Sequence, residues 1–80
     1  MLKVKLFAGL AEDAGRRTLE LPVDGNITVE ELKFRLAGEY PGLKGKFEKC
    51  MVAVNQEYAE PDTPISAADE VVFIPPVSGG

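Results

Sequence analysis

The residues most able to take part in a chemical reaction lie at the end of the chain, in the segment VVFIPPVSGG. Pro75 and Pro76 follow a strand-like run. Proline donates no backbone hydrogen bond and holds φ at about −65°, so this pair ends the strand and directs the chain outward as a semi-rigid spacer. Val77 offers an apolar contact, and residues 78–80 are small enough to enter a narrow cleft.

The terminal carboxylate of Gly80 is the one group here with obvious reactivity. A free carboxylate is a poor electrophile, but a mixed anhydride with AMP carries a good leaving group. A side chain beside that carbon would crowd both ATP and the attacking nucleophile, whereas glycine leaves space and accepts any backbone angle. The pattern therefore predicts a handle for the active site of another protein. The alternative is an ordinary frayed terminus.

The rest of the sequence offers little catalytic chemistry of its own. It contains no histidine and a single cysteine, and its glycines fit no phosphate-binding fingerprint. Cys50 shares strand parity with Val52, which favours a core residue over a reactive thiol. The neighbouring acids Glu57, Glu60 and Asp62 fit a solvated loop better than a calcium site. We expect no bound metal or cofactor, and no enzyme activity from this chain alone.

Length and charge narrow the class of protein further. Eighty residues form one small domain, and a net charge of −4 with mixed acids and bases argues against nucleic-acid binding. No apolar stretch is long enough for a membrane span, and the N-terminal residues do not resemble a signal peptide. With one cysteine there is no internal disulfide, so we expect a cytoplasmic protein.

Hydrophobic periodicity predicts the elements that must position the tail. Residues 2–8 and 18–23 alternate as two half-buried strands, joined by a short segment in which Gly15 marks a turn or a helix end. Residues 44–49 are expected to form a loop and residues 50–55 a strand with a tight turn. Residues 58–69 should be mostly irregular, and residues 70–74 form the last strand.

The clearest helix signal begins at Thr28. Thr28 and Glu31 match a capping box, Ile27 and Leu32 could form a hydrophobic staple, and Pro41 ends the helix. The apolar stripe that should face the sheet is Val29, Leu32, Leu36, Ala37 and Tyr40.

The order of elements is ββαββ, which predicts an α+β fold of the β-grasp, ubiquitin-like type. One mixed sheet of four to five strands would pack on one main helix, with the first and last strands parallel in the middle of the sheet. The domain would span residues 1–74. Residues 75–80 would form an extended, flexible C-terminal tail ending in Gly-Gly.

Three stretches make the sequence resemble a known family: LFAGLAEDAG, AVNQEYA and DEVVFIPPVSGG. They are similar to the small subunit of molybdopterin synthase, the MoaD-type sulfur carrier, which is itself related to the thiamine sulfur carrier ThiS and to ubiquitin. The resemblance covers nearly the whole chain, and FIPPVSGG is its most specific part. Ala68 departs from the glycine that is common in the family before DEV.

The resemblance implies a reaction cycle centred on Gly80. An activating enzyme of the ubiquitin E1 type would adenylate Gly80 with ATP and Mg²⁺, and a persulfide donor would convert it to a thiocarboxylate. The carrier would then insert its tail into the large subunit, in an assembly of two plus two subunits, and pass sulfur to the cyclic pyranopterin precursor of the molybdopterin dithiolene. The catalytic side chains would belong to the large subunit.

The tail needs a docking surface beside it. Phe7 shares a strand face with Lys3 and Lys5, so it is either covered by a loop or meant for a partner. Tyr58 and Ile74 could join it in one apolar patch, although Ile74 could also be a core residue. The predicted reactive residues are Gly79 and Gly80, and the predicted partner-binding residues are Phe7, Tyr58, Ile74, Pro75, Pro76, Val77 and Ser78.

Other functions share the same signals. A thiamine-type sulfur carrier would use the same chemistry with another partner. A ubiquitin-like protein modifier would use the same adenylate to form isopeptide bonds with lysines. A plain interaction module would keep its function without Gly79 and Gly80.

Overall fold

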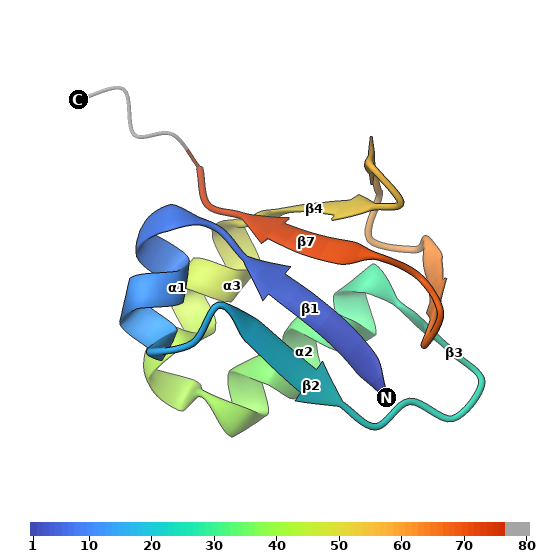
Figure 1. Ribbon diagram of the computed structural model, residues 1–80, viewed down its shortest axis with the longest axis horizontal. Coiled ribbons are helices and arrows are strands. Elements are labelled where there is room, and N and C mark those ends of the chain that lie inside the picture. The colour runs from blue at the N-terminus through green and yellow to red at the C-terminus, as the bar shows by residue number, and fades with distance from the viewer. Residues whose placement is uncertain (77–80) are drawn as a thin grey trace.

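The computed structural model describes residues 1–76, and the strands of its main sheet lie side by side across the molecule (Figure 1). Five strands form this sheet in the order β2-β1-β7-β4-β5. Their bounds are β1 Leu2–Leu6, β2 Thr18–Leu21, β4 Met51–Val54, β5 Glu57–Tyr58 and β7 Val71–Ile74. A separate two-stranded sheet pairs β3 Asn26–Thr28 with β6 Pro64–Ser66.

The centre of the main sheet has the predicted parallel pair. β1 runs parallel to β7, with Val4 opposite Val71, and antiparallel to β2, with Leu2 opposite Leu21. β7 is also antiparallel to β4. The alternation that predicted β1 is present as strictly alternating buried and exposed residues. The last strand is therefore bonded on both sides, as the β-grasp arrangement requires.

The main helix, α2 Val29–Glu39, begins where its cap was predicted. The Glu31 backbone N–H donates to Thr28 Oγ1 at 3.1 Å, and the Thr28 backbone N–H donates to Glu31 Oε1 at 3.4 Å. These two bonds satisfy donors that the first helical turn would otherwise leave open. The predicted stripe is confirmed, because Val29 and Leu36 are buried with Leu32, while Ala37 and Tyr40 pack partly against the core.

A shorter helix, α1 Ala8–Ala14, links β1 to β2. It ends at Gly15, whose φ of +72° lies in the left-handed region, and the Gly15 N–H bonds back to the Ala11 and Glu12 carbonyls. Glycine accepts that angle without the clash that a Cβ would meet. The sequence prediction that Gly15 marks a helix end is confirmed.

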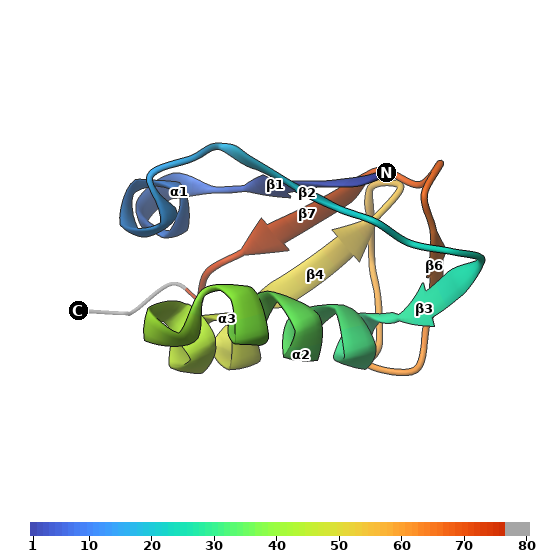
Figure 2. The same cartoon turned by 90° about the horizontal axis from the view of Figure 1, so that it is seen from below.

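The expected loop at residues 44–49 is wrong, because these residues form α3 Lys44–Lys49 after a short turn η1 Pro41–Leu43. Six residues are too few for a helix to be stable alone. Tertiary packing supplies the stability: the Phe47 ring is fully buried, with its centroid 5.8 Å from Phe73 and 6.5 Å from Tyr40. Figure 2 shows α2 and α3 together on one side of the sheet.

The segment 58–69, expected to be mostly irregular, contains β6. Ile65 of β6 is paired with Ile27 of β3, and both side chains are buried. A three-residue strand that pairs at long sequence separation leaves no periodic signal long enough to detect.

Within residues 1–76, no helix has the length and apolar character needed to cross a bilayer.

Cys50 lies at the end of α3 and joins the core, with 4% of its surface exposed. Burial raises the pKa of the Cys50 thiol, and the nearby Lys33 ammonium opposes part of that rise. The Lys33 Nζ also donates to the Cys50 carbonyl at 2.7 Å. A buried thiol with a raised pKa is a poor nucleophile, so Cys50 is the core residue that its strand parity indicated.

Candidate functional site

The base of the tail is set by β7. Val71 and Phe73 point into the core, whereas Val72 and Ile74 lie on the opposite, partly open face of the sheet. The strand ends at Ile74, and Pro75 is half-buried while Pro76 is exposed. The predicted site residues Val77, Ser78, Gly79 and Gly80 lie outside the described residues.

Three of the predicted partner-binding residues meet in one depression on the open face of the sheet. Phe7, Tyr58 and Ile74 line it, and it has a volume of about 350 Å³. Phe7 is 52% exposed and Tyr58 is 69% exposed, so Phe7 is not covered by a loop. The strand pattern keeps Ile74 out of the buried core. We call the lining residues the sheet-face patch: Phe7, Ala53, Gln56, Tyr58, Glu70, Val72 and Ile74.

Sequence reasoning missed two apolar members of the sheet-face patch, Val72 and Ala53. Val72 shares strand parity with Ile74, and Ala53 is directly paired with both Val72 and Tyr58. Residues two apart on a strand share a face, so placing Ile74 on the open face of the sheet would also have placed Val72 there. Ala53 required the register of β4, which no local pattern supplies.

Backbone geometry positions Tyr58 in the patch. Asn55 and Gln56 both have positive φ, 52° and 70°, which is the pattern of a two-residue type I′ turn. This turn folds β5 back onto β4 with Tyr58 opposite Ala53. The predicted tight turn is therefore confirmed, and its handedness matches the twist of the two strands.

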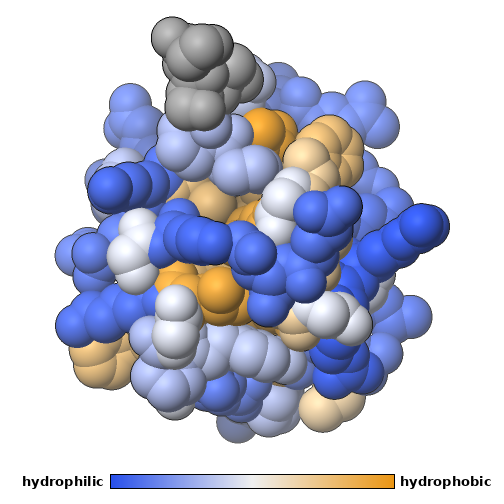
Figure 3. Space-filling model, turned by 90° about the vertical axis from the view of Figure 1, so that its left-hand side faces the viewer, coloured by the Kyte–Doolittle hydropathy of each residue, from blue (hydrophilic) through white to orange (hydrophobic). Residues whose placement is uncertain are grey.

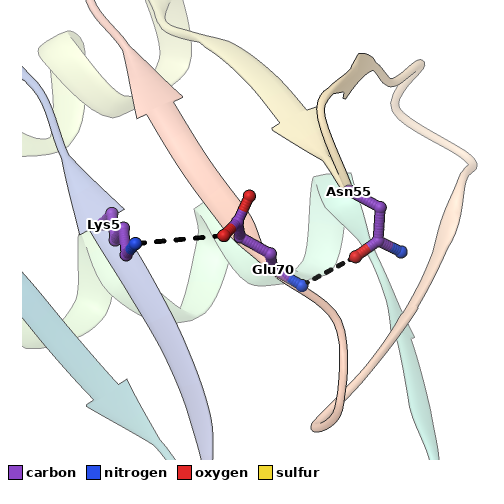
Figure 4. A network of polar contacts seen from close by, with 3 residues as sticks. All are labelled: Lys5, Asn55 and Glu70. Carbon is purple, nitrogen blue, oxygen red and sulfur yellow. Dashed lines mark hydrogen bonds and ion pairs between the residues drawn. The ribbon is translucent and has the colours of Figure 1, made fainter.

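A polar network holds this turn against β7 (Figure 4). The Asn55 backbone N–H donates to the Glu70 carbonyl at 2.7 Å, and the Glu70 N–H donates to Asn55 Oδ1 at 3.0 Å. The Asn55 amide also donates to Asp69 Oδ1 at 3.1 Å. Lys5 Nζ lies 3.9 Å from Glu70 Oε2 across the sheet. Glu70 thus forms a charged rim for the patch.

The Asp69 carboxylate accepts a hydrogen bond on each of its two oxygens, and these bonds favour its ionised form. The Ser66 backbone N–H donates to Asp69 Oδ2 at 2.8 Å, and the Asn55 amide donates to the other oxygen. These hydrogen bonds, the Ser66 backbone bond first, hold the pKa of Asp69 below its ordinary value because they stabilise the carboxylate. The loop that leads into β7 is therefore tied down by an ionised side chain.

The sequence favours a solvated loop over a calcium site for the acids Glu57, Glu60 and Asp62. Across residues 1–76, no group of three or more acids and cysteines is arranged to hold a metal ion. The three acids are exposed, and Glu57 lies on β5 while the other two lie in the following loop. Most of the side chains that line the sheet-face patch are apolar, which suits protein docking.

Comparisons with known proteins agree with this architecture. The model of the ThiS family matches residues 4–80. The molybdopterin synthase sulfur carrier subunit of Escherichia coli K12 is 38% identical over the whole length of both chains. Small archaeal modifier protein 1 of Haloferax volcanii is 39% identical, with 95% of this chain and 97% of the relative covered.

Solved structures give the same fold. A crystal structure of small archaeal modifier protein 1 from Haloferax volcanii superposes with a TM-score of 0.83 at 38% identity, covering 99% of this chain and 98% of that one. A chain in the complex of subunits 1 and 2 of molybdopterin-converting factor from Helicobacter pylori 26695 shares the fold, with a TM-score of 0.68 at 24% identity and coverage of 99% and 97%. Since the family model spans nearly every residue of this ubiquitin-like β-grasp domain, the chain belongs to the ThiS family.

Proposed function

We propose that this protein is the sulfur carrier subunit of a molybdopterin synthase. The observation that carries the proposal is the sheet-face patch, because Phe7, Tyr58 and Ile74 gather beside β7, the strand that leads to the tail. A docking surface and a reactive end would then lie on the same part of the molecule. The full-length similarity to a sulfur carrier subunit, which reaches residue 80 in the family match, supports the same assignment.

The chemistry of the proposal rests on Gly80. An E1-like activating enzyme, using ATP and Mg²⁺, joins the carboxylate to AMP and releases pyrophosphate. A persulfide sulfur then attacks the acyl carbon, and AMP leaves with the bonding electron pair. A second thiol cleaves the resulting S–S bond by forming a disulfide, which leaves a thiocarboxylate on Gly80. Glycine at residues 79 and 80 keeps both attacks uncrowded.

The large subunit supplies the second half of the reaction. The carrier docks through the sheet-face patch, and the tail brings the thiocarboxylate to the pyranopterin precursor. Phe7 and Tyr58 are the expected anchors, because exposed aromatic side chains dominate binding energy when a partner buries them. Catalytic side chains reside on the large subunit, so the carrier is a co-substrate. We expect the cycle to run in the cytoplasm, where thiols stay reduced.

The test is the location of sulfur after incubation with ATP, a persulfide donor and the activating enzyme from the same source. High-resolution mass spectrometry with fragmentation should place one oxygen-to-sulfur exchange on Gly80. Fragmentation is needed because oxidation of Met1 or Met51 changes the mass by a similar amount. An unmodified Gly80, with an activating enzyme shown to work on a related carrier, would contradict the proposal.

Protein modification is the second candidate, and one observation favours it. The relative from Haloferax volcanii that is 39% identical over nearly the full length is named a modifier protein. That function would produce conjugates in which Gly80 is joined to lysine amines of other proteins. Digests of tagged protein from cells, searched for lysines that carry a C-terminal remnant, would detect them. Their presence with no thiocarboxylate would favour the modifier.

Two further alternatives can be distinguished from the proposed function, one by a gene deletion and the other by removing the last two residues. A thiamine-type carrier would leave a deletion strain dependent on thiamine, whereas the proposed function predicts loss of molybdenum-enzyme activity. A plain interaction module would remain functional without Gly79 and Gly80. Under the proposal, removing these two glycines abolishes sulfur loading while the domain still folds, because the core is built from residues 2–73.

A further inference from the structure

A second hollow lies at the end of the molecule formed by α1 and α3, and it is separate from the sheet-face patch. Its volume is about 220 Å³. We call it the end hollow, and its lining residues are Gly9, Leu10, Asp13, Lys46, Lys49, Pro75 and Pro76. Figure 3 views this end of the molecule, where apolar surface is visible between hydrophilic side chains.

The end hollow combines an apolar floor with a positive rim. Leu10 is almost fully buried and contributes to the floor, together with the two prolines. Lys46 Nζ forms an ion pair with Asp13, and no acid among residues 1–76 pairs with Lys49. The rim therefore carries one more positive than negative charge, in a chain whose net charge is −4. Such a spot is complementary to an acidic group of a binding partner.

The position of the hollow restricts what can cover it. Pro75 and Pro76 form part of its wall, so the chain leaves the domain at the edge of the hollow. Four residues, 77–80, span at most about 14 Å when fully extended. A protein that holds Gly80 in its active site must therefore place its own surface within about 14 Å of the hollow. The rim lysines and the apolar floor therefore lie within reach of that protein's surface.

We propose, resting on the proposed function, that the large subunit of molybdopterin synthase seats an aliphatic side chain in the end hollow and places a carboxylate beside Lys49. The base of the tail is then held through two surfaces, the sheet-face patch beside Ile74 and the end hollow beside Pro75 and Pro76. Contacts at both surfaces fix the direction in which the tail enters the active site. The specific chemistry sought on the partner is an apolar residue with an acidic neighbour.

The apolar part of the proposal is tested by filling the hollow. At Gly9 an added Cβ would meet nothing within 4 Å, and the same is true of Gly38 on α2, so Gly9→Leu has a matched control in Gly38→Leu. The affinity of the large subunit from the same source is measured by calorimetry. Gly9→Leu should raise the Kd at least about ten-fold, and Gly38→Leu should leave it unchanged. Thermal unfolding verifies that both variants are folded.

The charged part is tested by reversing one rim lysine. Lys49→Glu is compared with Lys44→Glu, because both lysines lie on α3 but Lys44 lines a depression between α2 and α3 instead. Lys49→Glu should raise the Kd at least about ten-fold at low salt and make binding less sensitive to added salt. Lys44→Glu should bind like the unmodified protein.

Three results would overturn the proposal. The first is unchanged affinity in both Gly9→Leu and Lys49→Glu, and the second is an equal loss in their controls. The third concerns the free protein: if removing residues 77–80 shifts the amide NMR signals of Gly9 and Lys49 as strongly as the large subunit does, the occupant is this chain's own terminus.

Sulfur loading of Gly80 is measured separately. If Gly80 is loaded with sulfur normally but Gly9→Leu and Lys49→Glu do not change the affinity, only the proposal about the end hollow is rejected. If these variants weaken binding but Gly80 is never loaded with sulfur, only the proposed function is rejected.

Discussion

At the scale of single residues, the side chains proposed for docking are different from those that form the core. Phe7 and Tyr58 are distant in sequence yet expose their rings in the same depression. Their neighbours in the chain point the other way, since Leu6 is buried and Ala59 packs partly against the core. Changes at Phe7 or Tyr58 should therefore affect binding far more than stability, whereas the opposite holds for the residues that face the core.

Phe7→Ala should weaken binding to the large subunit by at least about ten-fold, because a large exposed aromatic that becomes buried is a typical hot spot. Phe34→Ala is the matched control, since Phe34 is 80% exposed on α2 and does not line the sheet-face patch. Calorimetric titration of each variant measures the effect. Equal losses for Phe7 and Phe34 would show that the sheet-face patch is not the docking surface.

Gly15→Ala should lower the free energy of unfolding by about 1 kcal/mol, because alanine resists the left-handed angle at the end of α1. Gly38→Ala on α2 should instead raise it by about 0.5–1 kcal/mol, since alanine is the better helix former and the site has room. Urea denaturation of the two variants gives both values. A Gly15 variant as stable as the original chain would contradict the strained angle.

At the scale of elements, local sequence signals determined α2 and β1, while tertiary contacts determined α3 and β6. The capping box at Thr28 and Glu31 is a local signal, and its two bonds are present in the structure. Helix α3 has no side-chain cap, and it depends on burying Phe47 between Tyr40 and Phe73.

Thr28→Ala should reduce the free energy of unfolding by about 1 kcal/mol, because it removes the hydroxyl that accepts from the Glu31 backbone N–H. Thr28→Ser keeps that hydroxyl and is the matched control. Chemical denaturation monitored by circular dichroism would measure both. The cap contributes little if alanine and serine give the same midpoint.

Much of the fold and part of the candidate site were predictable from these local signals. Alternation in residues 2–6, the cap at Thr28 and the turn at residues 55–56 each specify one structure. The predicted meeting of Phe7, Tyr58 and Ile74 in one depression is also found. The end hollow was not predictable, because Leu10, Lys46 and Pro75 come together only through the packing of α1, α3 and β7.

At the scale of the whole molecule, the surfaces proposed for docking lie at the places where β7 ends. The sheet-face patch includes Ile74, and the end hollow includes Pro75 and Pro76. The loop before β7 is fixed by Asp69 through Ser66 and Asn55. One strand therefore connects an anchored loop, the centre of the sheet and both surfaces that are proposed for docking.

The Asp69 network predicts how stability depends on acid. Because the folded pKa of Asp69 is lowered, its contribution is fully present above the ordinary carboxyl value of about pH 4 and is lost as pH falls through the folded value. The urea midpoint should fall below about pH 4, and Asp69→Asn should reduce that fall.

The position of β7 also has a mechanical consequence. A pull along the axis of β7 would act on a strand that is bonded to β1 on one side and to β4 on the other. Load in that direction shears both ladders at once, so many hydrogen bonds must break together rather than one after another. An edge strand would have a single ladder to resist the load. Both ladders would therefore have to fail before a pull on the end of β7 could separate this strand from the sheet.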